Sequence, residues 1–218
     1  MRREVRTIAQ IVLDMLFPVM CIGCARSGFI VCDECSESTP LRESKPVDID
    51  VSESIDKCYI AALYENKIIH TLIESAKYFG SKRSAKQLGF ILARYLQTIS
   101  LDTKGLAIMP VPLHSRRLRE RGYNQSEIIA DVVGEILGVC VVKDVVKRTV
   151  YTKSQVHLHK SDRYSNVSGV FVVTKKCDYD SVLLIDDVIT TGATCSSIAG
   201  VLTKAGARRV MPCAVAKH

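Results

Sequence analysis

The amino-acid sequence predicts an α/β protein with a parallel β-sheet flanked by helices and a small four-cysteine finger before it. Two observations support this prediction. From residue 57 onward, short apolar runs alternate with helical patterns, which is typical of parallel sheets with helical crossovers. Near the N-terminus, four cysteines form two closely spaced Cys-x-x-Cys pairs. We therefore expect residues 1–45 to form a helix and a finger, and residues 46–218 to form the main domain.

The elements of the main domain follow from apolar runs and the signals that end them. Short apolar runs predict strands, and apolar residues three and four apart predict amphipathic helices. Three glycines lie where helical patterns stop, as expected for helix ends: Gly80, Gly138 and Gly206. The expected strands are residues 57–64, 106–111, 139–146, 170–173, 182–185 and 210–216. The expected helices cover residues 68–76, 88–96, 128–137 and 198–202. The segments 113–124 and 147–168 are expected to be loops.

Composition favours an anionic partner. The 218 residues, 47% of them hydrophobic, suit one medium domain with a small appendage. The formal charge of +7 favours a phosphorylated small molecule or nucleic acid. The chain has no Trp and only 6% aromatic residues, so a base-stacking platform would have few residues to use. No apolar run approaches the ~18–20 residues that cross a bilayer, so we expect no membrane span.

The first residues predict a short amphipathic helix that ends near Pro18. Basic residues before an apolar stretch resemble a signal peptide, but Gln10 and Asp14 interrupt the stretch and no small-residue cleavage site follows. Packing on the domain is favoured over membrane binding. The apolar residues at helical spacing are Ile8, Ile11, Val12, Met15 and Leu16.

The paired cysteines Cys21, Cys24, Cys32 and Cys35 predict a structural zinc site. Four thiolates supply a tetrahedral set of soft ligands, and a closed site of this kind leaves no position for catalysis. Redox activity is the alternative for a single Cys-x-x-Cys, but the doubled motif favours metal. The other cysteines lie among apolar residues and are expected to be core thiols: Cys58, Cys140, Cys177, Cys195 and Cys213.

The run Val182–Thr194, VLLIDDVITTGAT, is the most informative segment. It predicts a buried strand, an acidic pair, a hydroxyl-rich turn and a helix. Backbone N–H groups at such a turn and the helix dipole favour a phosphate group. The carboxylates of Asp186 and Asp187 suit the vicinal hydroxyls of a ribose. The candidate phosphate-binding residues are Thr190, Thr191, Gly192, Ala193 and Thr194.

Two further segments are basic. The first follows the strand at residues 106–111 and lies before a helix, where arginine side chains and the helix dipole favour a pyrophosphate or nucleic-acid phosphate. Its candidate residues are Arg116, Arg117, Arg119, Arg121, Gly122, Tyr123, Asn124 and Gln125. The second, residues 147–168, is long and unpatterned and could close over a charged substrate. Its candidate residues are Arg148, Lys153, Gln155, Lys160 and Arg163.

Together these motifs resemble the ComF family, amidophosphoribosyltransferase-like proteins linked to competence for natural transformation. The resemblance covers nearly the whole chain. Its most specific part is the pattern in which Pro-x-Pro-Leu leads to Arg-Gly-Tyr-Asn-Gln. The segments that carry it are Leu16-Phe17-Pro18 with the finger, Pro110–Leu113, Arg121–Gln125, Arg148-Thr149, Gln155, Arg163, Asn166-Val167 and Val182–Thr194.

The resemblance implies a type I phosphoribosyltransferase fold, a cytoplasmic location and a role after DNA has entered the cell. It implies that the loop at residues 190–194 binds the 5-phosphate of phosphoribosyl pyrophosphate, with Mg²⁺ accompanying the pyrophosphoryl group. The segment 116–125 would hold pyrophosphate, and residues 148–163 would form the flexible loop. The pyrophosphate segment is longer and richer in arginine than in many enzymes of this superfamily.

The sequence leaves two functions open, and also their combination, in which phosphoribosyl pyrophosphate binding regulates contact with DNA. The first is a phosphoribosyltransferase with an unidentified acceptor, in which Asp186 and Asp187 are the catalytic candidates and electrostatics stabilise an oxocarbenium-like state. The second is a non-catalytic adaptor in which the basic segments and the finger bind single-stranded DNA, alongside other competence proteins. Binding of the second kind would weaken steeply with salt.

Overall fold

The computed structural model describes residues 18–47, 55–99, 101–151 and 169–217. The chain divides into two compact units between Thr39 and Pro40. The helix expected at residues 8–16 lies outside the described residues. So do four of the five candidates in the second basic segment, namely Lys153, Gln155, Lys160 and Arg163. In the parts that are described, no helix is long and apolar enough to cross a membrane.

The smaller unit is a tight turn followed by a short helix, α2 (Asp33–Glu37). Met20 and Ser27 form an antiparallel bridge, and the Ala25 N–H donates to the Cys21 carbonyl at 2.9 Å. Ala25 has φ of 60° and Gly28 has φ of 92°, both left-handed, so the chain reverses within a few residues. This reversal brings the two cysteine pairs to the same place.

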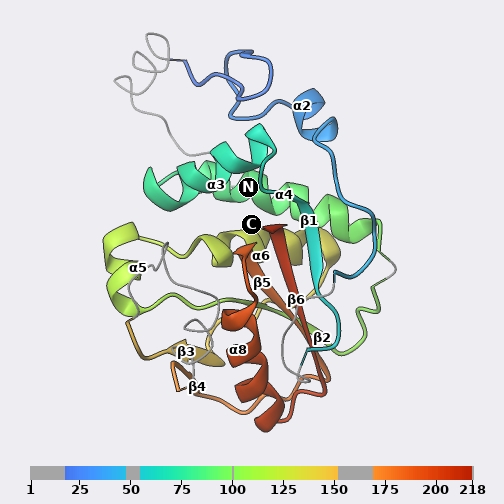
Figure 1. The fold of residues 1–218 in the computed structure, drawn as a ribbon, viewed down its shortest axis with the longest axis vertical. Helices are drawn as coiled ribbons and strands as arrows, with labels where there is room; N and C mark the ends of the chain where they lie inside the picture. The colour runs from blue at the N-terminus through green and yellow to red at the C-terminus, as the bar shows by residue number, and fades with distance from the viewer. Residues whose placement is uncertain (1–17, 48–54, 100, 152–168, 218) are drawn as a thin grey trace. The chain divides into compact units, whose positions relative to one another are not determined.

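The larger unit is built on a four-stranded parallel sheet in the order β1-β6-β5-β2 (Figure 1). The parallel sheet that the sequence predicts is confirmed. Pro110, the last residue of β2, pairs with Ile185, and Ile185 pairs with Cys213, so β5 and β6 extend together past the end of β2 as far as Ile189 and Lys217. The strands are β1 (Tyr59–Leu63), β2 (Leu106–Pro110), β5 (Ser181–Ile189) and β6 (Arg209–Lys217).

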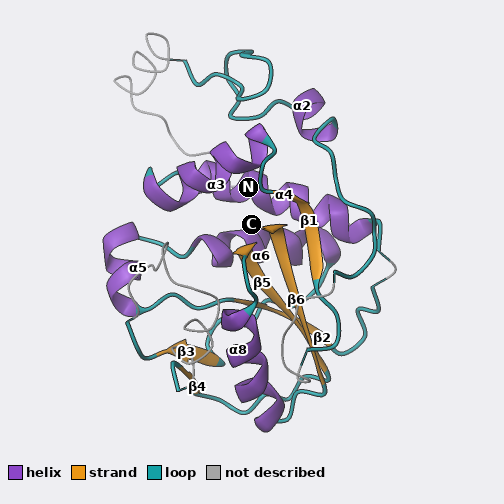
Figure 2. Cartoon of the chain, in the orientation of Figure 1, coloured by secondary structure: helices purple, strands orange, loops and turns teal. Residues whose placement is uncertain are grey.

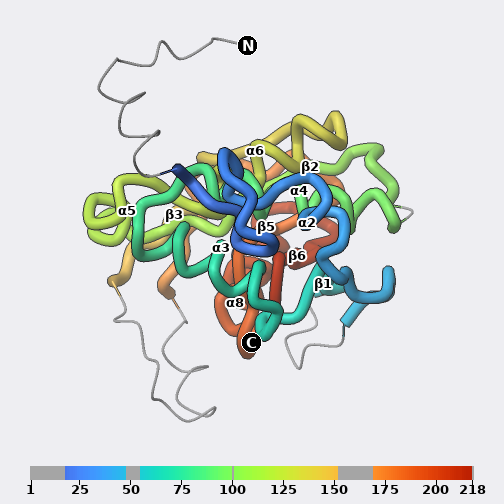
Figure 3. The backbone as a smooth tube through the Cα atoms, turned by 90° about the horizontal axis from the view of Figure 1, so that it is seen from above, coloured from blue at the N-terminus to red at the C-terminus, as the bar shows by residue number. Residues whose placement is uncertain are grey.

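Helices cover both faces of the sheet (Figures 2 and 3). Val182 and Leu184 of β5 pack in one core cluster with Ile198 and Leu202 of α8. On the opposite face, α4 and α6 pack against the sheet, because side chains of a strand alternate between its faces. The helices are α3 (Lys67–Tyr78), α4 (Lys82–Gln97), α5 (Ser115–Arg121), α6 (Gln125–Leu137) and α8 (Ala193–Lys204).

The expected loop at residues 113–124 is wrong, because it contains helix α5 (Ser115–Arg121). The His114 ring accepts from the Arg116 N–H at 3.2 Å at the start of this helix, and Gly122, with φ of 79°, ends it. Between them lie Arg, Leu and Glu, which favour helix, and no Pro. A basic composition is therefore compatible with a helix and does not by itself indicate a loop.

The expected strand at residues 139–146 is also wrong. Only Val141 forms a bridge, beside Ile108, and the chain then enters a separate antiparallel pair. That pair is β3 (Val146–Arg148) with β4 (Phe171–Val173), so the strand expected at 170–173 exists but does not join the main sheet. Of the five expected core thiols, four are buried, but Cys140 is exposed.

Two glycines allow α4, α6 and the chain after α6 to pack closely together. A Cβ at Gly89 of α4 would lie 2.7 Å from the Val132 Cβ of α6. A Cβ at Gly134 of α6 would lie 2.4 Å from Val141 Cγ2, so this glycine lets the chain return beside β2. The contact of α4 with α6 therefore depends on the missing side chain at Gly89.

We predict that Gly89→Ala destabilises the protein by about 1–3 kcal/mol, because overpacking forces the two helices apart. Gly200→Ala in α8 is the matched control, because nothing lies within 4 Å of its added methyl group. That control should stabilise the helix by about 0.5–1 kcal/mol. Urea unfolding of both variants checks this, and equal effects would contradict the close packing.

Candidate functional site

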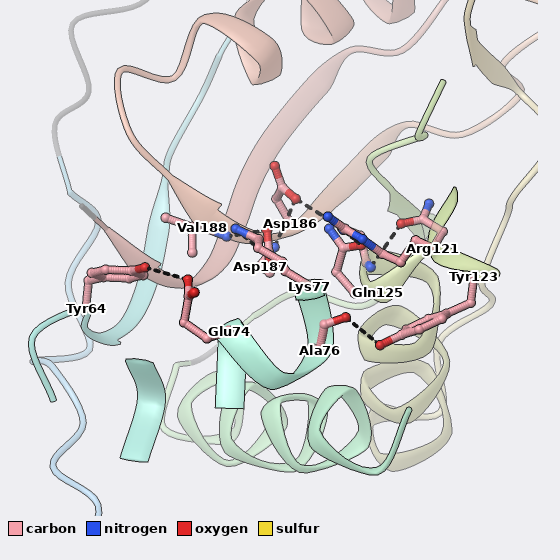
Figure 4. A network of polar contacts seen from close by, with 12 residues as sticks. Tyr64, Glu74, Ala76, Lys77, Arg121, Tyr123, Gln125, Asp186, Asp187 and Val188 are labelled. Atoms are coloured by element: carbon pink, nitrogen blue, oxygen red, sulfur yellow. Dashed lines mark hydrogen bonds and ion pairs between the residues drawn. The ribbon is translucent and has the colours of Figure 1, made fainter. Parts of the chain in front are cut away.

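The acidic pair lies inside β5 rather than after it. The strand continues to Ile189, four residues past the expected end at Ile185. Because side chains alternate along a strand, Asp186 and Asp187 point to opposite faces of the sheet (Figure 4). The two carboxylates therefore have different surroundings and different partners.

Asp187 is held by an ion pair with Lys77. The Lys77 Nζ lies 2.9 Å from Asp187 Oδ2, and the side chains are 22% and 4% exposed. The other carboxylate oxygen accepts from the Val188 N–H at 2.9 Å. Burial lowers the pKa of Lys77, but attraction to Asp187 outweighs burial and the pKa lies above its ordinary value. Lys77 is therefore protonated, and it neutralises the more buried aspartate.

Two hydrogen bonds fix the end of α3 that carries Lys77 (Figure 4). The Tyr123 hydroxyl donates to the Ala76 carbonyl at 2.5 Å. The Tyr64 hydroxyl donates to the Glu74 carboxylate at 3.3 Å. One contact comes from the segment before α6 and the other from the end of β1, so both sides of the helix end are tied to the domain.

Sequence reasoning missed Lys77. The signal was present, because Lys77 continues the buried stripe of α3 formed by Ile69, Leu72, Ile73 and Ala76. A charged residue in such a position is rarely buried without a partner. The sequence alone did not say which carboxylate that partner is.

Asp186 is the partly exposed aspartate. Its Oδ1 accepts from the Ser126 hydroxyl at 3.0 Å and from the Asp187 N–H at 2.9 Å. Burial and the neighbouring Asp187 charge raise the pKa of Asp186 to about 7, against the opposing effect of Lys77. A carboxyl group with this pKa can both accept and release a proton near neutral pH.

The expected phosphate loop is a turn leading into a helix, as predicted. Gly192 has φ of 80° and directly precedes α8, whose first turn contains no acidic residue. Thr190 is exposed, while Thr191 and Thr194 are half-buried. The Thr191 hydroxyl lies 3.5 Å from the Ala193 N–H. The first N–H groups of a twelve-residue helix thus begin where β5 ends, an arrangement suited to an anion.

The arginines of the first basic segment differ in exposure. Arg116 and Arg119 are exposed on α5, and Arg116 pairs with Glu120 at 2.9 Å. The Arg116 guanidinium also lies over the Tyr151 ring, 4.7 Å from its centroid. Arg117 and Arg121 are half-buried. The Arg116 and Arg119 side chains are therefore accessible to solvent, and Arg116 also contacts Tyr151.

The motif Arg121–Gln125 makes contacts within the protein. Arg121 donates to the Gln125 side chain. The Asn124 amide donates to the Val111 carbonyl at 3.0 Å, and its oxygen caps α6 by accepting from the Ser126 N–H at 3.1 Å. Tyr123, Asn124 and Gln125 are buried. In this structure the motif joins β2, α3 and α6, and that role was not expected from the sequence.

Arg148 is the one described candidate from the second basic segment. Its guanidinium lies over the Phe171 ring, 5.5 Å from the centroid. Burial and repulsion from Arg117 lower the pKa of Arg148, while Asp186 raises it. These interactions place Arg148, Arg117 and Asp186 in one electrostatic neighbourhood at the carboxyl edge of the sheet.

The four paired cysteines come together in the smaller unit. All four sulfur atoms lie within 4.8 Å of one another. The Cys21–Cys32 and Cys24–Cys32 sulfur distances are 3.7 and 3.6 Å. Zn–S bonds of about 2.3 Å in a tetrahedron require sulfur separations of about 3.8 Å, so this cluster fits a metal ion. Burial acts to raise the pKa of the Cys21 thiol, but backbone N–H donors, including those of Cys24 and Cys32, lower it to about 6.

Comparison with known proteins shows the family of the chain. No protein-family model matches the chain. Competence protein F of Haemophilus influenzae is 30% identical over 200 residues, which cover 88% of this chain and 87% of that protein. The chain belongs to the ComF competence protein family.

Other relatives match a smaller part of the chain or have a lower sequence identity. Competence protein ComFC of Streptococcus pneumoniae is 24% identical over 186 residues, covering 85% of this ComF chain and 80% of that protein. DNA utilization protein YhgH of Salmonella typhi is 34% identical over 103 residues, covering 47% of this chain and 45% of that protein.

Solved structures give weak matches. Glutamine phosphoribosylpyrophosphate amidotransferase from B. subtilis has 19% identity and a TM-score of 0.39, over 61% of this ComF chain and 26% of that chain. A purine phosphoribosyltransferase from Pyrococcus horikoshii has 18% identity and a TM-score of 0.33, over 58% and 68%. Scores this low support no argument about activity.

We predict that Lys77→Met destabilises this ComF protein by about 2–4 kcal/mol, because it leaves the Asp187 charge buried without its partner. Adding Asp187→Asn should restore most of the loss. Lys143→Met is the control, because its pair with Asp131 is 39% and 48% exposed and should contribute less than about 1 kcal/mol. Denaturant unfolding checks this, and equal losses in Lys77→Met and Lys143→Met would contradict it.

We predict that the purified full chain contains a single zinc ion, and that Cys32→Ser lowers its zinc content. Cys140→Ser should leave the metal content unchanged, because this cysteine is exposed and outside the cluster. Metal analysis by atomic emission after dialysis checks both variants. Full zinc content in Cys32→Ser would show that the metal is bound elsewhere.

Proposed function

We propose that this protein binds phosphoribosyl pyrophosphate at the carboxyl end of β5 and acts in the handling of DNA during competence. The observation that carries the proposal is the position of Asp186. Its carboxyl group is partly exposed, and only a few residues separate it from the first N–H groups of α8. A ribose with hydroxyl groups at one end and a 5-phosphate at the other matches these two features.

The two aspartates take different roles in this proposal. Asp186 accepts hydrogen bonds from the ribose hydroxyls, because it is the less buried member of the pair. Asp187 holds the Lys77 ammonium in place, and that ammonium has further N–H donors for a phosphoryl oxygen. Residues 190–194 hold the 5-phosphate. Arg117 and Arg148 supply positive charge on the Asp186 side of the strand.

Two bound metals belong to the proposal. Zinc held by the four cysteines stabilises a unit too small to fold on its own core. Magnesium accompanying the pyrophosphoryl group would supply charge neutralisation. The family of the chain supports the role in competence, because the relatives are named as competence and DNA utilization proteins. Transfer of the phosphoribosyl group to an acceptor is the reaction that this site would serve.

Binding of single-stranded DNA is the second candidate function. It is favoured by Arg116 and Arg119, which are exposed on α5, and by the net charge of +7. Backbone phosphates are the groups that such exposed cations contact. This function does not require turnover and can coexist with sugar-phosphate binding.

We predict that calorimetry detects binding of phosphoribosyl pyrophosphate with Mg²⁺ to the full chain, and that Asp186→Asn weakens it about ten- to hundredfold. Loss of hydrogen bonds to a charged acceptor has this magnitude. Asp131→Asn, an exposed acidic residue of α6, is the control and should bind as the wild type does. Absence of heat with the wild-type protein at millimolar ligand would refute the proposal.

A further inference from the structure

The corner between α3 and α4 exposes two adjacent aromatic side chains. Tyr78 is 66% exposed and Phe79 is 80% exposed. Among the large hydrophobic side chains of the described segments, Phe79 is the most exposed. The chain has few aromatic residues and no Trp, so the exposure of two neighbours here is unexpected for a merely solvated turn. Exposed aromatic rings gain most from a partner that offers flat surfaces.

The adjoining first turns of α4 carry positive charge. Lys82, Arg83 and Lys86 are exposed, and the first turn of this helix contains no acidic residue. No carboxylate within the described ranges pairs with these three cations. Cations near a helix N-terminus are disfavoured by the helix dipole. A bound anion would relieve this unfavourable arrangement, so the charge of the surface favours an anionic partner.

The backbone beneath the corner is held firmly. Ala76 accepts from the Tyr123 hydroxyl, and Lys77 is paired with Asp187, so the residues just before the aromatic pair are anchored on both sides. The Lys82 Nζ lies 5.7 Å from the centroid of the same Tyr123 ring. Tyr78 and Phe79 are therefore presented outward from a fixed helix end. Lys77, the residue before them, reaches the acidic pair of β5 (Figure 4).

We propose that this surface, formed by Tyr78, Phe79, Lys82, Arg83 and Lys86, binds single-stranded nucleic acid. Unpaired bases stack on the two rings, and backbone phosphates contact the three cations. Stacking on a side chain needs a base that is not enclosed in a duplex, which selects single strands. The proposal specifies where the second candidate function resides and does not depend on phosphoribosyl pyrophosphate binding.

The experiment measures fluorescence anisotropy of a labelled oligothymidylate with the full chain over a range of salt concentrations. The double variant Tyr78→Ala, Phe79→Ala should weaken binding at least tenfold with little change in the salt slope, since stacking contributes about 1–3 kcal/mol per base. The triple variant Lys82→Gln, Arg83→Gln, Lys86→Gln should lower the salt slope by about two to three, because phosphate contacts release counterions. Duplex DNA should bind more weakly, with little effect of the aromatic substitutions.

Two control variants make the test specific. Ile136→Ala removes an exposed apolar side chain from α6 and should bind DNA as the wild type does. The double variant Arg116→Gln, Arg119→Gln removes the exposed cations of α5. If that variant loses binding and the corner variants do not, DNA binds at α5, and this proposal is overturned while the second candidate function survives.

Three other results would overturn the proposal. One is that the wild-type chain binds no single-stranded DNA, which also removes the second candidate function. Another is equal weakening of single-stranded and duplex binding in the aromatic variant. The last is conversion of a dimer to a monomer by the aromatic substitutions with DNA binding unchanged, which would make the corner a contact between copies. Calorimetry should show that the same variants bind phosphoribosyl pyrophosphate as the wild type does. A loss of DNA binding is thereby distinguished from failure of the sugar-phosphate site.

Discussion

The ion pair between Lys77 and Asp187 is the constraint on which the candidate site depends. A buried carboxylate at the end of a central strand requires a partner, and α3 supplies it from a part of the chain more than a hundred residues away. The pair fixes the end of α3 against β5. Asp186 is the less buried member of the acidic pair, and burial and the Asp187 charge raise its pKa to about 7. The two adjacent aspartates therefore differ: Asp187 is paired with Lys77, and Asp186 is partly exposed.

The segment from Arg121 to Ser126 connects the remaining pieces. Tyr123 contacts α3, Asn124 contacts the chain after β2 and caps α6, and Ser126 contacts Asp186 of β5. Residues that look like phosphate donors in the sequence are therefore occupied in holding three elements together. The positive charge available to a ligand comes instead from Arg116 and Arg119 on α5 and from the half-buried Arg117 and Arg148.

Much of the fold could be predicted because its signals are local. The strand of β5, the turn at Gly192 and the following helix lie in consecutive residues, and α6 carries both an Asn cap and a stopping glycine. The cysteine cluster could be predicted from spacing alone. The failures have physical causes. The basic composition of residues 115–121 does not indicate helix α5. Residues 139–146 are apolar because Val139, Val145 and Val146 are buried, although only Val141 bridges to Ile108.

The sequence by itself determined the parallel α/β architecture, the hydroxyl-rich turn after the acidic pair and the four-sulfur cluster, since each rests on residue type and short spacing. Only the tertiary structure decided the partners. It paired Lys77 with Asp187, turned the Tyr123 hydroxyl to Ala76 and left Tyr78 and Phe79 exposed. The reason is that burial and pairing depend on which distant elements pack together. Strand alternation places Asp186 and Asp187 on opposite faces, but their residue type does not show which face or which partner each one will have.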